Sequence, residues 1–473
     1  MARSGAGEAR NGFCGATILN SRTGFCLFLA AVAAGLAIGA DAPLGAQSPS
    51  GGAGGARMAP GEEAPSWSND PPHHQHMAYQ SYLTLPDSPM KTEVGLYIGE
   101  VRHYTGDGDS GGSIAEGADE EDFVHNQLEL ILGTARFFNH FWNPDGGYNA
   151  GINALGQHDS NVKTAEQRWD QAVALYPTNK ALAYWHLGRT IHLIQDACQP
   201  AHAHNDAHDD VINSEQMEDF AATHYAEWNA QTKRPGSVDA LSAYPLAPID
   251  YETLPAQVVN SGGVDYSTLD AARKTRLFRL FLNAAETADN FESERVDADT
   301  DSIEFNLLAS TIGWHPVGQA APDPGQFTDA ELYLHADTVV PLATAYGAGI
   351  LTLFWDTTHP TVEFQPPGAT PARGVFDLTV FARTMDAVTL SYWPDGGAPV
   401  ALGAVSPSVY AGDRRRHFSL SFDSLAAGLG LTSPQTVIFR AEGTNADGFS
   451  AADEMTLVVS NRSDAGPSWI QYQ

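Results

Sequence analysis

The sequence has little cysteine: only Cys14, Cys26 and Cys198 occur in its 473 residues. The first two lie near the N-terminus, in a segment that we expect to be removed during export, so the mature chain keeps Cys198 alone. A single cysteine forms no intramolecular disulfide, which excludes a fold held together by disulfides. Cys198 follows an apolar helical run, so we expect it to be buried at a helix end and not to act as a nucleophile.

Basic residues are also scarce. Lysine and arginine total 25 against 57 aspartates and glutamates, which gives a formal net charge of −32 and a pI of about 4.6. Such a surface repels polyanions, which argues against nucleic acid as a partner. It also repels anionic lipid headgroups unless a bound metal or a local basic patch intervenes.

The N-terminal segment lacks a hydrophobic run long enough for a confident membrane span. Residues 25–38 are apolar, arginines precede them, and small residues at 40–42 offer a cleavage site. These features predict a signal peptide over residues 1–42 and a secreted, extracellular protein with bacterial-type export, with a retained membrane anchor as the alternative. Residues 43–66 are rich in Gly, Ala, Ser and Pro, and we expect them to be disordered or a pro-segment.

Two sequence patterns divide the rest of the chain. In residues 67–356, apolar residues recur at a spacing of three and four, as in 273–291 and 329–355, which predicts a helical domain. Pro341 is a candidate kink in the last of these helices. In residues 360–473, β-branched and aromatic segments alternate with turn signals, which predicts an all-β sandwich of the immunoglobulin or fibronectin type.

The segment 184–206 combines a helical apolar pattern with several histidines and aspartates. His192 and Asp196 are four residues apart, so they share one face of a helix. Pro200 ends that helix, and His202 follows closely enough to turn back toward its end. Two imidazoles and a carboxylate suit a zinc ion. A lone helical histidine is more often solvated or hydrogen bonded than a ligand, but the clustering here favours a metal site.

The stretch HLIQDACQPAH, residues 192–202, resembles the H-x-x-x-D-x-x-x-P-x-H core that the bacterial zinc-dependent phospholipases C share with the S1/P1 nucleases. The phospholipase C family also places an aspartate after G-x-x-x-x and ahead of an H-F-aromatic-x-P-D stretch. Asp122 follows Gly117 at that spacing, and the stretch NHFWNPD contains His140. The resemblance implies an all-α, zinc phospholipase C-like helical domain ahead of the β-sandwich.

The family uses an N-terminal tryptophan, whose free amine and carbonyl bind one zinc, and a histidine shortly after it. Trp67 and His76 take these places here, with His73 and His74 as competitors. The resemblance therefore implies processing before Trp67, because an internal tryptophan has no free amine to offer.

The last ligands of the family are an H-x-x-x-E pair followed by an aromatic residue. Glu218 supplies the glutamate, but Ser214 stands where the family has histidine. His208 and Glu215 are candidate replacements, and we expect His202, His208 and Glu218 to hold the third ion, with a weak or nearly empty third site as the alternative.

The resemblance implies two or three zinc ions. Such ions screen the charge of a phosphodiester and lower the pKa of bound water toward neutrality. It assigns Asp196 as a bridge between two ions and Asp122 as a ligand or general base, two roles that the sequence does not separate. No P-loop, G-x-S-x-G motif or credible Cys–His pair offers a rival chemistry. The expected metal ligands are Trp67, His76, Asp122, His140, His192, Asp196, His202, His208 and Glu218.

The expected function is that of a secreted phospholipase C, which hydrolyses glycerophospholipids to diacylglycerol and a phosphorylated headgroup. Such an enzyme touches a membrane surface transiently and needs no obligate protein partner. A 3′-nucleotidase or nuclease of the P1 type is one alternative, but that family has W-G-x-x-G-H where this chain has SWSNDPP, and it pairs half-cystines. A non-catalytic metal-binding surface protein on the same scaffold is the other alternative, which Ser214 favours and the retained ligand set opposes.

Overall fold

The computed structural model describes the greater part of the chain from Pro72 onward. Its described residues are 72–102, 112–121, 139–151, 159–205, 216–237, 244–254, 275–289, 291, 293, 327–367, 374–394, 396–407, 409–430 and 432–460. The predicted signal peptide (1–42), the segment 43–66, Trp67, Asp122 and His208 lie outside the described residues.

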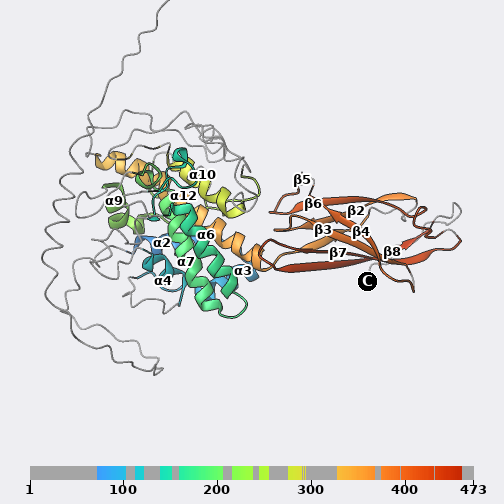
Figure 1. Ribbon diagram of the computed structural model, residues 1–473. Coiled ribbons are helices and arrows are strands. Elements are labelled where there is room, and N and C mark those ends of the chain that lie inside the picture. The colour runs from blue at the N-terminus through green and yellow to red at the C-terminus, as the bar shows by residue number, and fades with distance from the viewer. Residues whose placement is uncertain are drawn as a thin grey trace, which may run out of the picture. The chain divides into compact units, whose positions relative to one another are not determined.

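The first part of the described chain is helical, and the second part consists of strands (Figure 1). The predicted order of a helical region followed by an all-β sandwich is therefore confirmed. The helical elements are α2 (His73–Thr84), α3 (Pro89–Tyr97), α4 (Ile114–Glu120), η2 (Pro144–Gly146), α6 (Asn161–Leu175), α7 (Lys180–Ala197), α8 (Pro200–Ala203), α9 (Gln216–His224), η3 (Tyr225–Glu227), α10 (Arg276–Ala288) and α12 (Asp329–Thr358).

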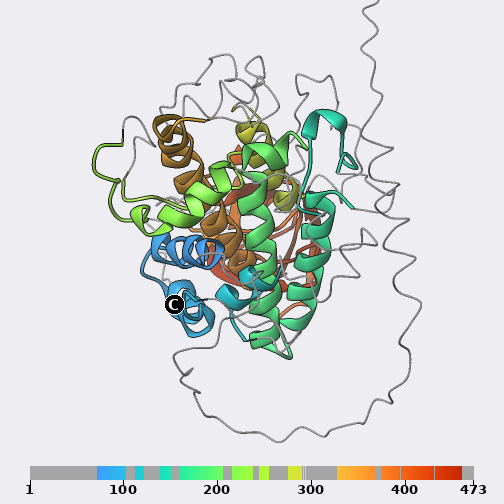
Figure 2. The ribbon, with the colours of Figure 1, turned by 90° about the vertical axis from the view of Figure 1, so that its left-hand side faces the viewer.

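Two helices, α7 and α12, form the centre of the helical region and pack against α2 (Figure 2). Helix α7 is buried on every face from Leu187 to Ala197, which is typical of a core helix. Its N-cap is Asn179, whose side chain accepts a hydrogen bond from the Leu182 N–H, and the helix ends before Pro200, as predicted.

Helix α12 begins with a capping box in which Thr328 and Glu331 satisfy each other's backbone N–H groups. It continues through Pro341 to Thr358 as a single helix. Among the described residues it is the one helix long and apolar enough to cross a membrane, but 94% of its apolar stretch is buried inside the protein. Helix α12 is therefore buried as a core helix of a folded domain is.

Helices α4 and α7 cross at two glycines. A Cβ atom on Gly117 would lie 2.0 Å from the Trp185 carbonyl oxygen, and one on Gly188 would lie 2.1 Å from the Ile114 carbonyl oxygen. Both clashes are with backbone, which does not yield, so only glycine permits this crossing. The crossing brings the Ala118 carbonyl against the side chain of His192.

The second part of the chain is a sandwich of two antiparallel four-stranded sheets, with strand orders β1-β2-β6-β5 and β4-β3-β7-β8. Alternate residues such as Leu378, Val380, Leu390, Val437 and Phe439 are buried between the sheets, which accounts for the alternating sequence pattern. The strands are β1 (Val362–Gln365), β2 (Val375–Ala382), β3 (Val388–Pro394), β4 (Val400–Val405), β5 (Val409–Tyr410), β6 (Arg416–Asp423), β7 (Gln435–Thr444) and β8 (Ser450–Val459).

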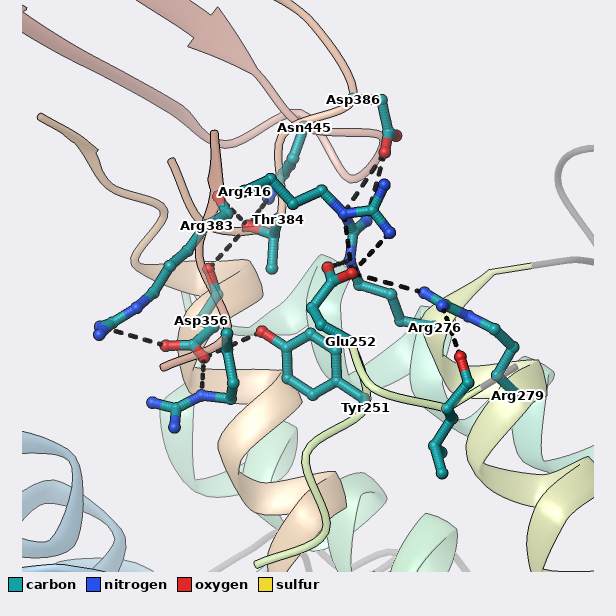
Figure 3. A network of polar contacts seen from close by, with 12 residues as sticks. Tyr251, Glu252, Arg276, Arg279, Asp356, Arg383, Thr384, Asp386, Arg416 and Asn445 are labelled. Carbon is teal, nitrogen blue, oxygen red and sulfur yellow. Dashed lines mark hydrogen bonds and ion pairs between the residues drawn. The ribbon is translucent and has the colours of Figure 1, made fainter. Parts of the chain in front are cut away.

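A polar network joins residues of the helical region to residues of the sandwich (Figure 3). Glu252 accepts hydrogen bonds from Arg276 and, at 2.8 and 2.6 Å, from Arg416 of β6. Asp356 near the end of α12 accepts hydrogen bonds from Tyr251 at 2.9 Å and from Arg414 at 2.6 Å. The side chains of Glu252 and Asp356 are 0% and 1% exposed. The helical region thus supplies buried carboxylates, and the sandwich supplies arginines that neutralise them.

Backbone groups take part in the same network. The Thr384 hydroxyl donates to the Asp356 carbonyl oxygen at 3.0 Å, and the Asn445 amide donates to the Thr357 carbonyl oxygen at 2.8 Å. These two bonds satisfy carbonyls in the last turn of α12, which have no partner within the helix.

His335 is a buried titratable residue in α12. Its ring lies between those of Phe291 and Phe327, with centroid separations of 5.5 and 5.2 Å. Neither ring nitrogen has a hydrogen-bond partner among the described residues. Burial lowers the pKa of His335 from 6.5 to about 4.

Replacing His335 with leucine is expected to make the protein less sensitive to acid. Between pH 6.5 and 4 the unfolded chain binds a proton at His335 that the folded chain does not, so stability falls as the pH decreases. The shift corresponds to roughly 3 kcal/mol of stability lost by pH 4. Urea unfolding of wild type and His335→Leu at pH 7 and pH 4.5 measures the difference. Both proteins protonate their other histidines alike, so an equal loss of stability in the two would contradict the expectation.

Candidate metal centre

Asp196 is the centre of a buried group of histidines. Its Oδ2 atom lies 3.2 Å from His140 Nδ1 and 3.1 Å from His192 Nε2. Its Oδ1 atom lies 3.7 Å from His74 Nε2. The three imidazoles and the carboxylate are all almost fully buried. His192 and Asp196 are one turn apart on α7, His74 lies on α2, and His140 lies in the segment that precedes η2.

Hydrogen bonds on the far side of the rings determine which nitrogen faces Asp196 with a lone pair. His192 Nδ1 lies 2.6 Å from the Ala118 carbonyl oxygen, and His74 Nδ1 lies 2.8 Å from Gln195 Oε1. These oxygens accept hydrogen bonds, so each Nδ1 donates, and the Nε2 of the neutral ring carries a lone pair. Lone pairs of nitrogen and carboxylate oxygen then face each other. A zinc-binding histidine has the same arrangement, because its other ring nitrogen donates to a carbonyl and orients the ring.

The separations around Asp196 match those of ligands on one ion. Two donors bound tetrahedrally to zinc at about 2.0–2.1 Å are roughly 3.3 Å apart. The separations of 3.1 and 3.2 Å from Oδ2 to His192 and His140 are close to that value. The other oxygen faces His74, and donor atoms of His74, His192 and Asp196 all lie within 4.8 Å of one another. The donor set therefore fits a buried metal site around Asp196.

The electrostatics of the group favour an ionised Asp196. Burial alone would raise the pKa of this carboxyl group, but positive charge on the neighbouring imidazoles of His192 and His140 outweighs burial and lowers the pKa below its ordinary value. Cys198, at the C-cap of α7, is buried, and burial raises the pKa of its thiol well above the ordinary value. A protonated, buried thiol is a poor nucleophile, as expected from the sequence.

Glu218 forms a second group with two further histidines. Its Oε2 atom lies 3.9 Å from His202 Nε2, and its Oε1 atom lies 4.0 Å from His73 Nε2. The His202 ring stacks on Phe141 with a centroid separation of 4.4 Å. The rings of His73 and His74 are 4.1 Å apart, so this group adjoins the one around Asp196.

Buried polar contacts hold the elements that carry these ligands. The Asn161 side chain donates to the carbonyl oxygens of His140 and Leu193 at 2.8 and 2.9 Å, which ties the segment before η2 to α7. Glu121 is fully buried and pairs with Arg189 of α7 and with Arg168 of α6. Burial would raise the pKa of Glu121, but these arginines lower it below its ordinary value, so the carboxylate stays charged.

The structure brings five of the nine expected ligands into these two groups: His140, His192 and Asp196 in one, and His202 and Glu218 in the other. The Nε2 atom of His76 instead lies 2.8 Å from the Trp228 carbonyl oxygen, while His74 faces Asp196. The helical spacing of the sequence predicts that His74 lies on the buried face of α2. His74 shares its face of α2 with the buried Met77, Ala78 and Ser81, at positions i+3, i+4 and i+7, whereas His76 does not.

A third group of acidic residues lies at the end of α10. Asp145, Glu286 and Asp289 have carboxylate oxygens within 4.8 Å of one another. His204 joins them, with Nδ1 2.9 Å from Asp289 Oδ1 and Nε2 2.7 Å from the Phe291 carbonyl oxygen. His204 therefore ties the C-cap of α8 to the end of α10, and the sequence alone does not separate it from the ligand histidines nearby.

No family model matches the sequence. No curated protein sequence matches it significantly either. Among solved structures, the chain is similar to the alpha-toxin of Clostridium perfringens from an avian strain, with a TM-score of 0.35 and 14% identity, over 82% of this chain and 98% of that one. It is also similar to the alpha toxin of Clostridium absonum, with a TM-score of 0.36 and 12% identity, over 84% of this chain and 100% of that one.

Proposed function

We propose that this protein is a secreted, zinc-dependent phosphodiester hydrolase that acts on glycerophospholipids as a phospholipase C. The observation that carries the proposal is the arrangement around Asp196, where ring nitrogens of three buried histidines face both oxygens of one carboxylate. A buried carboxylate needs positive charge beside it, which bound cations supply when the imidazoles are neutral. The sequence resemblance of residues 192–202 to the zinc phospholipases C supports the same assignment.

The chain offers ligands for more than one ion. His140, His192 and Asp196 Oδ2 would hold one ion, with Asp122 as a further ligand or as the general base. His74, Asp196 Oδ1 and the free amine of Trp67 would hold the second. Bound zinc ions screen the charge of a phosphodiester and lower the pKa of water toward neutrality.

The protein's own residues orient and insulate this site. The Ala118 carbonyl fixes the ring of His192, and the glycine crossing of α4 and α7 holds that carbonyl in place. Glu218 is about one quarter exposed, so the second group lies at the solvent side of the buried pair. A phosphodiester would approach from this side, and an attacking water would lose its proton to a neighbouring carboxylate.

Metal content and substrate turnover test the proposal on secreted protein that begins at Trp67. We expect two to three zinc ions per chain by elemental analysis, and hydrolysis of a phosphocholine ester. Turnover of a 3′-nucleotide in place of the phosphocholine ester would make the protein a nucleotidase. Zinc without turnover of either substrate would make it a metal-binding surface protein. Activity in protein that holds no zinc would contradict the proposal outright.

A further inference from the structure

We propose that His73 is a ligand of the third zinc ion, together with His202 and Glu218. It takes the role that the family resemblance gives to a histidine four residues before the glutamate, where this chain has Ser214. The inference rests on the proposed function, because it adds an ion to a zinc site. It assigns that ion to a residue of α2, far from Ser214 in the sequence.

The position of Glu218 between two imidazoles carries the inference. Its two oxygens face different rings: Oε1 lies 4.0 Å from His73 Nε2, and Oε2 lies 3.9 Å from His202 Nε2. Donors on one tetrahedral zinc are roughly 3.3 Å apart, so each pair needs to close by about 0.6 Å around an ion. The side chains of Glu218 and His73 are 26% and 13% exposed, which leaves them room for a movement of this size.

The orientation of His202 supports the same site. Its Nδ1 atom lies 3.3 Å from the His140 carbonyl oxygen, and its ring stacks on Phe141. A carbonyl accepts, so Nδ1 donates and the Nε2 lone pair points toward Glu218. The ring is thus oriented by the kind of outer contact that accompanies zinc-binding histidines.

The three histidines at the start of α2 face different groups, although donor atoms of His73, His74 and Glu218 also lie within 4.8 Å of one another. His74 faces Asp196, and His76 faces the Trp228 carbonyl oxygen. His73 is the first residue of the helix, directly after Pro72, and its Nε2 faces Glu218. The serine hydroxyl at position 214 is a poor zinc ligand, whereas the imidazole of His73 is a good one. His73 therefore supplies the nitrogen that the replaced histidine would have given.

Zinc content is the first measurement, because it does not depend on turnover. Secreted protein is dialysed against buffered zinc, and the ions per chain are counted by elemental analysis. We expect His73→Gln to hold one ion fewer than wild type, and His202→Gln likewise. His224→Gln is the matched control on α9, the helix that carries Glu218, and we expect it to keep the full number because His224 contacts the Phe220 carbonyl oxygen. Adding Ser214→His to His73→Gln should restore the ion, because it recreates the family's H-x-x-x-E spacing.

Two other results would overturn the assignment. If His73→Gln keeps every ion while His208→Ala or Glu215→Ala loses one, the third ligand is one of those residues. If His73→Gln also loses the ions held by Asp196, His73 belongs to that pair and not to a third site. Either result leaves the proposed function intact, provided that wild type holds zinc that Asp196→Asn loses. A wild-type protein without zinc would instead refute the proposed function itself.

Discussion

Asp196→Asn is expected to empty the proposed zinc pair and to lower the proposed phosphodiester turnover by about three orders of magnitude or more. The carboxylate contacts His140, His192 and His74 through both oxygens. Asparagine keeps the shape but removes the negative charge and one of the two acceptor oxygens. It can therefore neither bridge two cations nor offset their charge in a buried site.

Elemental analysis and steady-state kinetics on the same preparation measure the effect. Asp170→Asn, on the exposed face of α6, makes the identical chemical change away from the histidines and should leave both quantities at wild-type values. Circular dichroism checks that the variant is folded. Wild-type zinc content in folded Asp196→Asn would refute the bridging role.

Glu252→Gln is expected to reduce the free energy of unfolding by about 3–5 kcal/mol. Burial alone would raise the pKa of Glu252, but Arg276 and Arg416 outweigh it and hold the pKa below its ordinary value. The carboxylate is thus charged when folded, and its stabilising effect is lost as the pH falls through that lowered pKa. Glutamine leaves the nearby guanidinium groups without their counter-charge, and Arg279, which lies 3.9 Å from Glu252, is among them.

Urea unfolding followed by tryptophan fluorescence and by circular dichroism measures the loss and tests whether both regions unfold together. The matched control is Glu363→Gln. Glu363 lies 3.9 Å from Arg415 in a pair whose carboxylate is 60% exposed, and such exposed pairs contribute about 0–1 kcal/mol. A similar, small change in both variants would show that the buried network does not stabilise the protein.

Helical periodicity predicts which candidate ligands that are close in sequence also lie close together in the fold. His192 and Asp196 share a face of α7 because they are one turn apart, and the structure places them 3.1 Å from each other. The α2 and α12 helices show where this reasoning has to be applied with care. The period of α2 selects His74 for the buried face, although His76 lies nearer the apolar stretch that follows. Helix α12 runs on through Pro341, because a long buried segment outweighs the local cost of one proline.

The spacing of residues in the sequence does not predict contacts between segments that are far apart in the chain. His73 and Glu218 meet through the packing of separate helices, and no periodicity relates residues so far apart. The same is true of Glu252 and Arg416, which join a loop of the helical region to β6. Both contacts depend on how whole helices and strands pack against each other. That packing depends on the sequence as a whole and not on a local motif.

The arginines engaged in buried pairs have a consequence for how the protein behaves in solution. Arg189, Arg276, Arg414 and Arg416 lie within ion pairs whose carboxylates are at most 1% exposed, so these positive charges do not reach the solvent as free cations. Among the described residues, these pairs therefore leave fewer unpaired positive charges than a count of the lysines and arginines suggests. The negative charge of this protein therefore repels another anionic surface. The range of that repulsion falls to roughly 8 Å at physiological ionic strength. Encounter with such a surface should accelerate as salt is added, which is the reverse of the behaviour of proteins that dock through basic patches.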